Sequence, residues 1–187
     1  LSTQYGVKVR CFEADLGSEE GPIALHAAIR KARLDVEILV NNAGVLSEGP
    51  FLDTALEDHR QIVHVNVRAL VELSHLFGTD MRRRQSGRIL NICSTSAFQP
   101  IPTLATYAAS KAFVLSLSES MAIENARHRV TVTALCPGFV KTDMTAKDGG
   151  GHMGLPGVPI LGPREVAEQG YRALMKGKPV YVNGLAN

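Results

Sequence analysis

The chain has 187 residues, 45% of them hydrophobic and 20% charged, which indicates a globular domain with a substantial core and argues against disorder. The net charge of +2 is too small to imply nucleic acid as a partner, and the basic run Met81–Arg84 is expected to be the solvated end of a helix. The three isolated cysteines, the lack of a histidine metal motif and the lack of a long apolar run argue against a disulfide framework, a metal site and a membrane span. We therefore expect a soluble cytoplasmic protein.

Strand and helix patterns alternate along the chain. A first strand is predicted at Val7–Asp15, and a helix follows at Glu19–Leu34, with Pro22 near its first turn. The short apolar run Val36–Val40 is typical of a strand covered on both faces. The later elements are a helical region at Leu56–Arg84, a strand at Arg88–Ser94, a helix at Thr106–Arg127, a strand at Val130–Cys136, a helix at Pro163–Gly177 and a strand at Pro179–Val182. This alternation predicts an α/β fold with a Rossmann-like, doubly wound parallel sheet in three α/β/α layers, formed by one domain over residues 1–187.

The segment Lys147–Pro163 interrupts this alternation because it is rich in Gly and Pro. It is either a flexible connection or a mobile lid beside a ligand site, and both interpretations stay open. The segment follows the carboxyl end of a strand, which is the end where ligands bind in such sheets.

Polar groups follow three of the predicted strands. "NNAG" (Asn41–Gly44) comes after Val36–Val40, and Ser94 ends the strand "RILNICS". Thr142 lies in the turn "CPGFVKTDM" that follows the strand ending at Cys136. Since the carboxyl ends of parallel strands meet at one edge of the sheet, these groups are predicted to form a site there.

The motifs "NNAG", "YAASK" (Tyr107–Lys111), a serine thirteen residues before Tyr107, and "PGFVKT" together resemble the classical short-chain dehydrogenase/reductase family. The resemblance runs from about Val7 to Thr142 and is nearest to the broad-specificity bacterial branch. It implies an NAD(P)(H)-dependent oxidoreductase that interconverts a carbonyl and an alcohol by hydride transfer. It further implies a small-molecule substrate and a homo-oligomer, a dimer or tetramer, that engages neither nucleic acid nor membrane.

The resemblance also implies roles for four residues. Tyr107 would be the general acid/base that gives a proton to the substrate oxygen, and Ser94 would hydrogen bond to that same oxygen. Lys111, one turn further along the same helix face, would lower the pKa of Tyr107 and hold the cofactor ribose. Asn66 would hold a water behind the lysine, although it could instead be a buried polar residue that bends its helix.

Cofactor contacts are implied at both ends of the dinucleotide. Asp15 would accept a hydrogen bond from the adenine amino group, unless it only caps the following helix. The resemblance places Asn42, Ala43 and Gly44 at the adenosine half, and Pro137, Gly138, Val140 and Thr142 at the nicotinamide. It favours NADP(H) over NAD(H), and the substrate wall is expected to consist of Ala97, Phe98, Leu104 and the Lys147–Pro163 segment.

The family's first two strands and its Gly-rich turn have no match in this chain, so we expect an N-terminally incomplete domain that binds its cofactor weakly. Two other classes stay open. One is a non-catalytic nucleotide-binding or scaffolding relative, which would have no reason to keep Ser94, Tyr107 and Lys111. The other is an extended-type sugar-nucleotide epimerase, which shares the Tyr-x-x-x-Lys spacing but not "NNAG".

Overall fold

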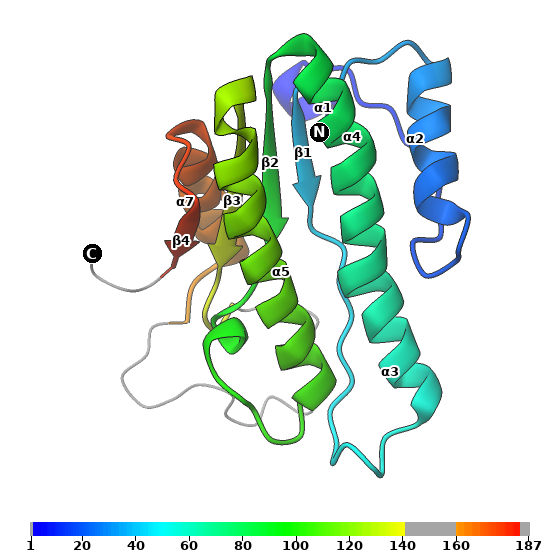
Figure 1. Ribbon diagram of the computed structural model, residues 1–187, viewed down its shortest axis with the longest axis vertical. Helices are drawn as coiled ribbons and strands as arrows, with labels where there is room; N and C mark the ends of the chain where they lie inside the picture. The colour runs from blue at the N-terminus through cyan, green and yellow to red at the C-terminus, as the bar shows by residue number, and fades with distance from the viewer. Residues whose placement is uncertain (1, 141–159, 184–187) are drawn as a thin grey trace.

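A four-stranded parallel sheet forms the centre of the molecule (Figure 1). The computed structural model describes residues 2–140 and 160–183. The strands lie in the order β1 (Ile38–Asn41), β2 (Gly87–Ile92), β3 (Val130–Cys136) and β4 (Val180–Val182), and every neighbouring pair is parallel. The predicted parallel α/β fold of Rossmann type is therefore confirmed.

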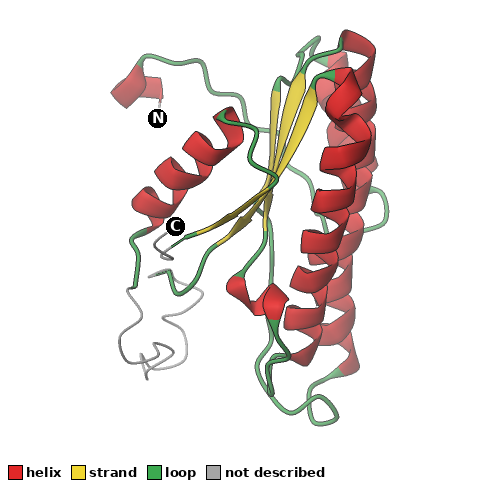
Figure 2. Cartoon of the chain, turned by 60° about the vertical axis from the view of Figure 1, so that its left-hand side comes forward, coloured by secondary structure: helices red, strands yellow, loops and turns green. Residues whose placement is uncertain are grey.

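Helices cover both faces of the sheet (Figure 2). The short helix α1 (Ser2–Tyr5) lies near the N-terminus. The helices that follow are α2 (Gly21–Lys31), α3 (Leu56–Val63), the π-helix η1 (His64–Ala69), α4 (Leu70–Arg84), the 3₁₀ turn η2 (Thr95–Phe98), α5 (Ala105–Asn125), the 3₁₀ turn η3 (Ala126–His128) and α7 (Pro163–Met175). Helices α4 and α5 pack on one face of the sheet and α7 on the other, which makes three layers.

The core lies on both sides of β2 and β3. Under α4 and α5 it contains Leu70, Val114 and Ala134 with Cys93 and Cys136, and a second cluster is centred on Met81 and Ile89. A third cluster lies under α7 and consists of Leu90, Leu135, Val166 and Leu174. Because both faces are covered, β2 and β3 are buried along most of their length rather than at alternate residues.

Local sequence explains how the elements end. Helix α4 stops at Gln85, which adopts the left-handed conformation with φ 54°. At Gly87 a Cβ would lie 2.3 Å from Cγ of Met81, so only glycine lets β2 start this close to α4. Helix α7 begins at Pro163, where proline supplies the φ of a first helical turn and needs no hydrogen bond of its own.

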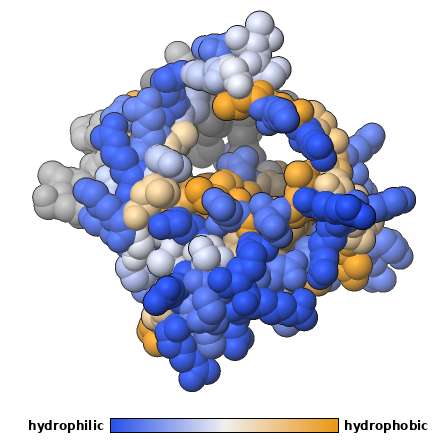
Figure 3. Space-filling model, turned by 90° about the horizontal axis from the view of Figure 1, so that it is seen from above, coloured by the Kyte–Doolittle hydropathy of each residue, from blue (hydrophilic) through white to orange (hydrophobic). Residues whose placement is uncertain are grey.

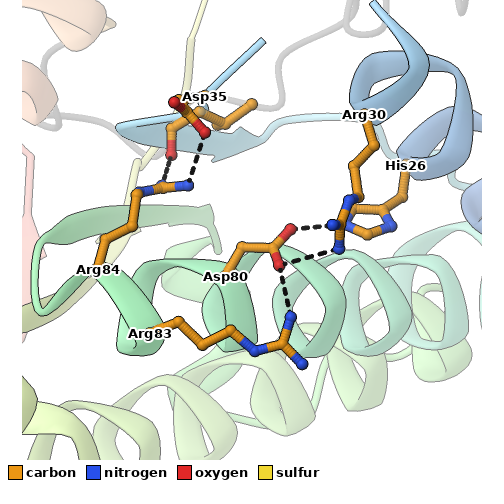
Figure 4. Close-up of polar contacts among 7 residues, drawn as sticks. His26, Arg30, Asp35, Asp80, Arg83 and Arg84 are labelled. Carbon is orange, nitrogen blue, oxygen red and sulfur yellow. Dashed lines mark hydrogen bonds and ion pairs between the residues drawn. The ribbon is translucent and has the colours of Figure 1, made fainter. Parts of the chain in front are cut away.

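Ion pairs join α2 to α4 (Figure 4). Asp80 of α4 accepts from His26 Nε2 at 2.9 Å, and its other oxygen lies 3.4 Å from both Arg30 and Arg83. Loss of solvation acts to raise the pKa of Asp80, but the hydrogen bond from His26 and the nearby arginine charges lower it on balance. Arg84, the last residue of α4, pairs with Asp35 at 3.4 Å.

The predicted strand at Val7–Asp15 is wrong. These residues form no helix or strand, and the side chains of Val7 and Val9 are about half exposed, at 52% and 47%. A strand needs a hydrogen-bonding neighbour, and among the described residues this segment pairs with none. Strand β1 is consequently an edge of the sheet within the described residues, and Val40 on it is 49% exposed.

No described helix is both long enough and apolar enough to cross a membrane. Of the predicted lid at Lys147–Pro163, residues 147–159 lie outside the described residues. Its last residues are described, and Leu161 forms a single parallel bridge with Val140.

Candidate active site

The segments that leave β1, β2 and β3 meet at the carboxyl edge of the sheet. Thr95 N donates to Pro137 O at 2.9 Å and so joins the ends of β2 and β3. Ser94 caps η2, because its Oγ accepts from Ser96 N at 3.1 Å. The same Oγ lies 3.1 Å from Ser96 Oγ, so neighbouring hydroxyl and amide groups hold the Ser94 side chain in place.

Tyr107 and Lys111 lie one turn apart at the beginning of α5. Lys111 Nζ is 5.5 Å from the centre of the Tyr107 ring and donates to Ile92 O at 2.9 Å. The lysine is 6% exposed, so its ammonium is enclosed between the end of β2 and the phenol. The spacing of four residues thus places both groups on the same face of one helix.

Burial sets the proton affinities of this pair. It raises the pKa of Tyr107, an effect that the Ser94 hydroxyl partly opposes by hydrogen bonding. Burial also lowers the pKa of Lys111, because a charged ammonium loses its hydration there. That Lys111 lowers the pKa of Tyr107 stays a prediction, because in this structure the pKa of the phenol is raised on balance by loss of solvation. Loss of solvation is the largest influence on both groups, and it favours the neutral form of each.

Asn66 lies in η1 and holds the loop after β1. Its Oδ1 accepts from Val45 N at 2.8 Å, and its Nδ2 donates to Val45 O at 2.9 Å and Ser110 Oγ at 3.2 Å. Ser110 Oγ in turn donates to Tyr107 O at 2.7 Å. π-Helical turns are rare and often occur at functional sites, and here the turn carries the side chain that links η1 to α5. Ser110 was not predicted, although it stands within the "YAASK" motif.

Two glycines differ in the space around them. A Cβ on Gly44 would lie 3.4 Å from Asn66 Oδ1 and 3.6 Å from Lys111 Nζ, so the backbone of "NNAG" directly adjoins both side chains. A Cβ on Gly138 would meet nothing within 4 Å. Backbone exposed next to a buried ammonium suits a bound nicotinamide dinucleotide, which brings ribose hydroxyls and a carboxamide to such groups.

The remaining predicted cofactor residues are less closely grouped. Asp15 Oδ1 accepts from Gly17 N at 2.9 Å, so this carboxylate stabilises the turn before α2. Asn42 and Ala43 are exposed and line a cavity together with Leu16. Thr142 lies outside the described residues.

That cavity has a volume of about 220 Å³ and is lined mainly by apolar side chains of α2, β1 and α4. Its walls include Leu25, Ile29, Leu39, Val40, Leu73 and Phe77. Seen from above, the molecule shows hydrophobic residues gathered around a hollow (Figure 3). Of the predicted substrate wall, Ala97 packs on the core cluster of Cys93 and Val114, whereas Phe98 is 55% exposed.

A buried polar network fixes the end of β1. Asn41 Nδ2 donates to Ser74 Oγ at 2.9 Å and Asn91 Oδ1 at 2.8 Å, and Asn91 Nδ2 donates to Ser118 Oγ at 2.9 Å. The network joins β1, β2, α4 and α5 at Asn41, the first residue of "NNAG". It was not predicted, and only the shared register of Asn41 and Asn91 could have indicated it.

Comparison with known proteins identifies the family of this chain. Residues 1–151 match the family model described as short chain dehydrogenase. The chain belongs to the short-chain dehydrogenase family. It is 37% identical over 147 residues to an uncharacterised oxidoreductase of Escherichia coli (strain K12), YohF, in an alignment that covers 77% of this chain and 57% of YohF.

Two solved structures extend the comparison. A short-chain dehydrogenase from Sphingobium yanoikuyae in complex with NADPH aligns with a TM-score of 0.88 and 27% identity, covering 100% of this chain and 72% of that one. A putative NAD(P)-dependent gluconate 5-dehydrogenase from Beutenbergia cavernae with bound NADP aligns with a TM-score of 0.72 and 38% identity, covering 77% of this chain and 57% of that one. This short-chain dehydrogenase chain thus spans less than two thirds of the length of YohF.

Proposed function

We propose that this chain belongs to an NAD(P)(H)-dependent oxidoreductase that interconverts a carbonyl and an alcohol. The observation that carries the proposal is the Tyr107–Lys111 pair, in which an enclosed ammonium lies 5.5 Å from the phenol ring and beside the backbone of Gly44. A non-catalytic binding module could use Lys111 to hold a ribose, but it would have no use for the proton relay of Ser94 and Tyr107 beside it.

In the direction of reduction, Tyr107 Oη gives a proton to the carbonyl oxygen while Ser94 Oγ donates a hydrogen bond to the same atom. The nicotinamide, when bound, supplies the hydride, so one hydride and one proton convert the carbonyl to an alcohol. Lys111 stabilises the phenolate that remains. Asn66 holds the loop at Val45 and, through Ser110, the helix that carries Tyr107.

The cofactor would lie along the carboxyl edge of the sheet. Lys111 and the segment Asn42–Gly44 would hold its ribose and adenosine parts, and Pro137, Gly138, Val140 and Thr142 would hold the nicotinamide. Asp15 would reach the adenine if its turn reoriented. NADP(H) is preferred to NAD(H), because the resemblance favours it and several similar solved structures carry NADPH or NADP, although a 4-hydroxyisoleucine dehydrogenase among them is complexed with NADH.

The substrate is proposed to be a moderately apolar carbonyl compound. The segment from Ser94 to Tyr107 contains no Asp, Glu, Lys or Arg, and Phe98 within it is exposed. A carboxylate substrate would need a cation that this segment does not supply.

A cofactor-oxidation assay tests the proposal. Full-length protein is mixed with NADPH or NADH and a panel of ketones, and the nicotinamide absorbance is followed. Turnover of a ketone that is lost in Tyr107→Phe supports the proposal. Cofactor binding without turnover of any carbonyl would indicate the non-catalytic alternative. Epimerisation of sugar nucleotides with no turnover of ketones, followed by separating the epimers, would indicate the epimerase.

We further propose a cytoplasmic homo-oligomer. Apolar side chains are exposed on the outer helices, among them Val71 on α4 with Phe113 and Ile123 on α5. Such side chains are usually covered when they form a contiguous patch. Light scattering of the full-length protein at micromolar concentration would give the mass, and a monomer would contradict this proposal.

A further inference from the structure

A cluster of basic residues lies at the amino end of the sheet, opposite the candidate active site. Its basic members are Arg82 in the last turn of α4 and Arg127 and His128 of η3, just before β3 begins, and the uncharged Gln85 that caps α4 lies with them. Both guanidinium groups point at one atom: Arg82 lies 3.3 Å and Arg127 3.1 Å from His128 Nε2. Gln85 Nε2 lies 3.3 Å from the other ring nitrogen, Nδ1.

The cluster has more donors than acceptors. The orientation of the Gln85 amide is set because the same Nε2 donates to Arg82 O at 2.8 Å, so a donor faces Nδ1 as well. A neutral imidazole accepts at one nitrogen only, and a protonated one accepts at neither. Donors face both ring nitrogens, so in either tautomer of His128 at least one of these donors has no acceptor on the ring.

The charges of the cluster are also uncompensated. Arg83 and Arg84, the two residues that follow Arg82, pair with Asp80 and Asp35 (Figure 4). Among the described residues no ion pair includes Arg82 or Arg127. Two like charges within reach of one atom repel each other, and an anion between them would relieve the repulsion.

We propose that Arg82, Arg127, His128 and Gln85 form a binding site for a small phosphate-bearing anion, either inorganic phosphate or a phosphate ester. Phosphate provides several acceptor oxygens and two negative charges, so it satisfies each donor and compensates both guanidinium groups. A single carboxylate or chloride would satisfy fewer of them. The site is independent of the proposed oxidoreductase function, because none of its residues contacts the carboxyl edge of the sheet.

Histidine protonation gives a specific readout. The pKa of His128 is lowered by loss of solvation first and then by the charges of Arg82 and Arg127. A phosphate bound between the arginines favours the imidazolium, so the pKa of His128 should rise when phosphate binds. Unspecific accumulation of anions along a basic surface would not act on one histidine alone.

The test is a titration of the full-length protein with inorganic phosphate, at constant ionic strength maintained with chloride. NMR follows the histidine ring resonances, and the His128→Gln variant assigns the signal of His128. We expect a saturable shift of that signal and a raised His128 pKa. Arg82→Gln and Arg127→Gln should each weaken the affinity about tenfold, the loss of one hydrogen bond to a charged group.

Arg83→Gln is the matched control. It removes an equal charge from the residue next to Arg82, but the guanidinium of Arg83 is already paired with Asp80. Its affinity for phosphate should change by less than about twofold, because exposed charges are screened. The proposal is overturned if chloride alone produces the same shift, if the His128 pKa does not respond, or if Arg83→Gln weakens binding as much as Arg82→Gln.

Discussion

Replacement of Tyr107 by phenylalanine separates the chemistry of the candidate site from its architecture. The substitution removes only the phenolic oxygen, while the ring that lies 5.5 Å from Lys111 Nζ remains. Ser94 keeps both of its contacts with Ser96, and Asn66 keeps its contacts with Val45. The binding surface for cofactor is therefore expected to change little.

The expected loss of activity follows from the role of the missing group. A positioned general acid contributes roughly 10²–10⁴ in rate, which corresponds to about 3–5 kcal/mol of activation free energy. Stability should change by less than about 1 kcal/mol, because phenylalanine fills the same space and no buried partner is left with a charge. A fall in turnover of two to four orders of magnitude, with unchanged cofactor affinity, is thus the prediction.

The assay compares single-turnover reduction of a ketone by NADPH in the full-length protein and its variants. Tyr171→Phe is the matched control, because Tyr171 is 54% exposed on α7 and should leave the rate unchanged. Ordinary turnover by Tyr107→Phe, or an equal loss in Tyr171→Phe, would refute the reasoning.

Four further predictions follow from burial, steric contacts and charge. Lys111→Met should abolish turnover yet raise the urea midpoint of the cofactor-free protein at neutral pH. Burial lowers the pKa of Lys111, so the charged lysine destabilises the folded protein at neutral pH. The stability gained by the substitution should disappear as the pH rises to 10.5, where the lysine loses its charge in the unfolded protein as well. An unchanged urea midpoint would contradict this prediction. Gly87→Ala should destabilise the protein by about 1–3 kcal/mol through its clash with Met81. Gly138→Ala should unfold like wild type but bind NADPH more weakly, and equal affinity would argue against a nicotinamide at that loop. Asp80→Asn should lower the free energy of unfolding by about 1 kcal/mol at pH 7. This difference from wild type should shrink as the pH falls below 3.8 and through the lowered pKa of Asp80, and urea unfolding at a series of pH values measures it.

Much of the fold was accessible from local pattern. The strand Val130–Cys136 and the helical region Leu56–Arg84 have the predicted limits, because apolar runs and a left-handed stop are encoded within a few residues. Val7–Asp15 failed for the opposite reason. Its alternation suits a strand, but a strand exists only with a neighbour, and pairing is a property of the whole sheet.

The candidate site shows the same division. Helical spacing was enough to place Tyr107 and Lys111 together, and strand order was enough to bring Ser94 to their edge of the sheet. The pKa of Tyr107 could not be inferred, since it depends on how much water the packed helices exclude. The network of Asn41 and Asn91 was likewise hidden, because it joins residues fifty positions apart through a register that only the assembled sheet defines.

The π-helix at His64–Ala69 lies between α3 and α4, so it determines which side of α3 faces the site relative to α4. A π-turn accommodates one residue more than an α-turn, so deleting a single residue there would restore regular winding. The helix before it would then rotate by about 100° and shift by about 1.5 Å along its axis. His59 on α3, whose Nδ1 lies 2.7 Å from Thr106 Oγ1 beside Tyr107, would face elsewhere. A one-residue length change in this segment would therefore turn a whole helix away from the candidate catalytic tyrosine, whereas the same change in the exposed loop at Gly49–Thr54 would act only locally.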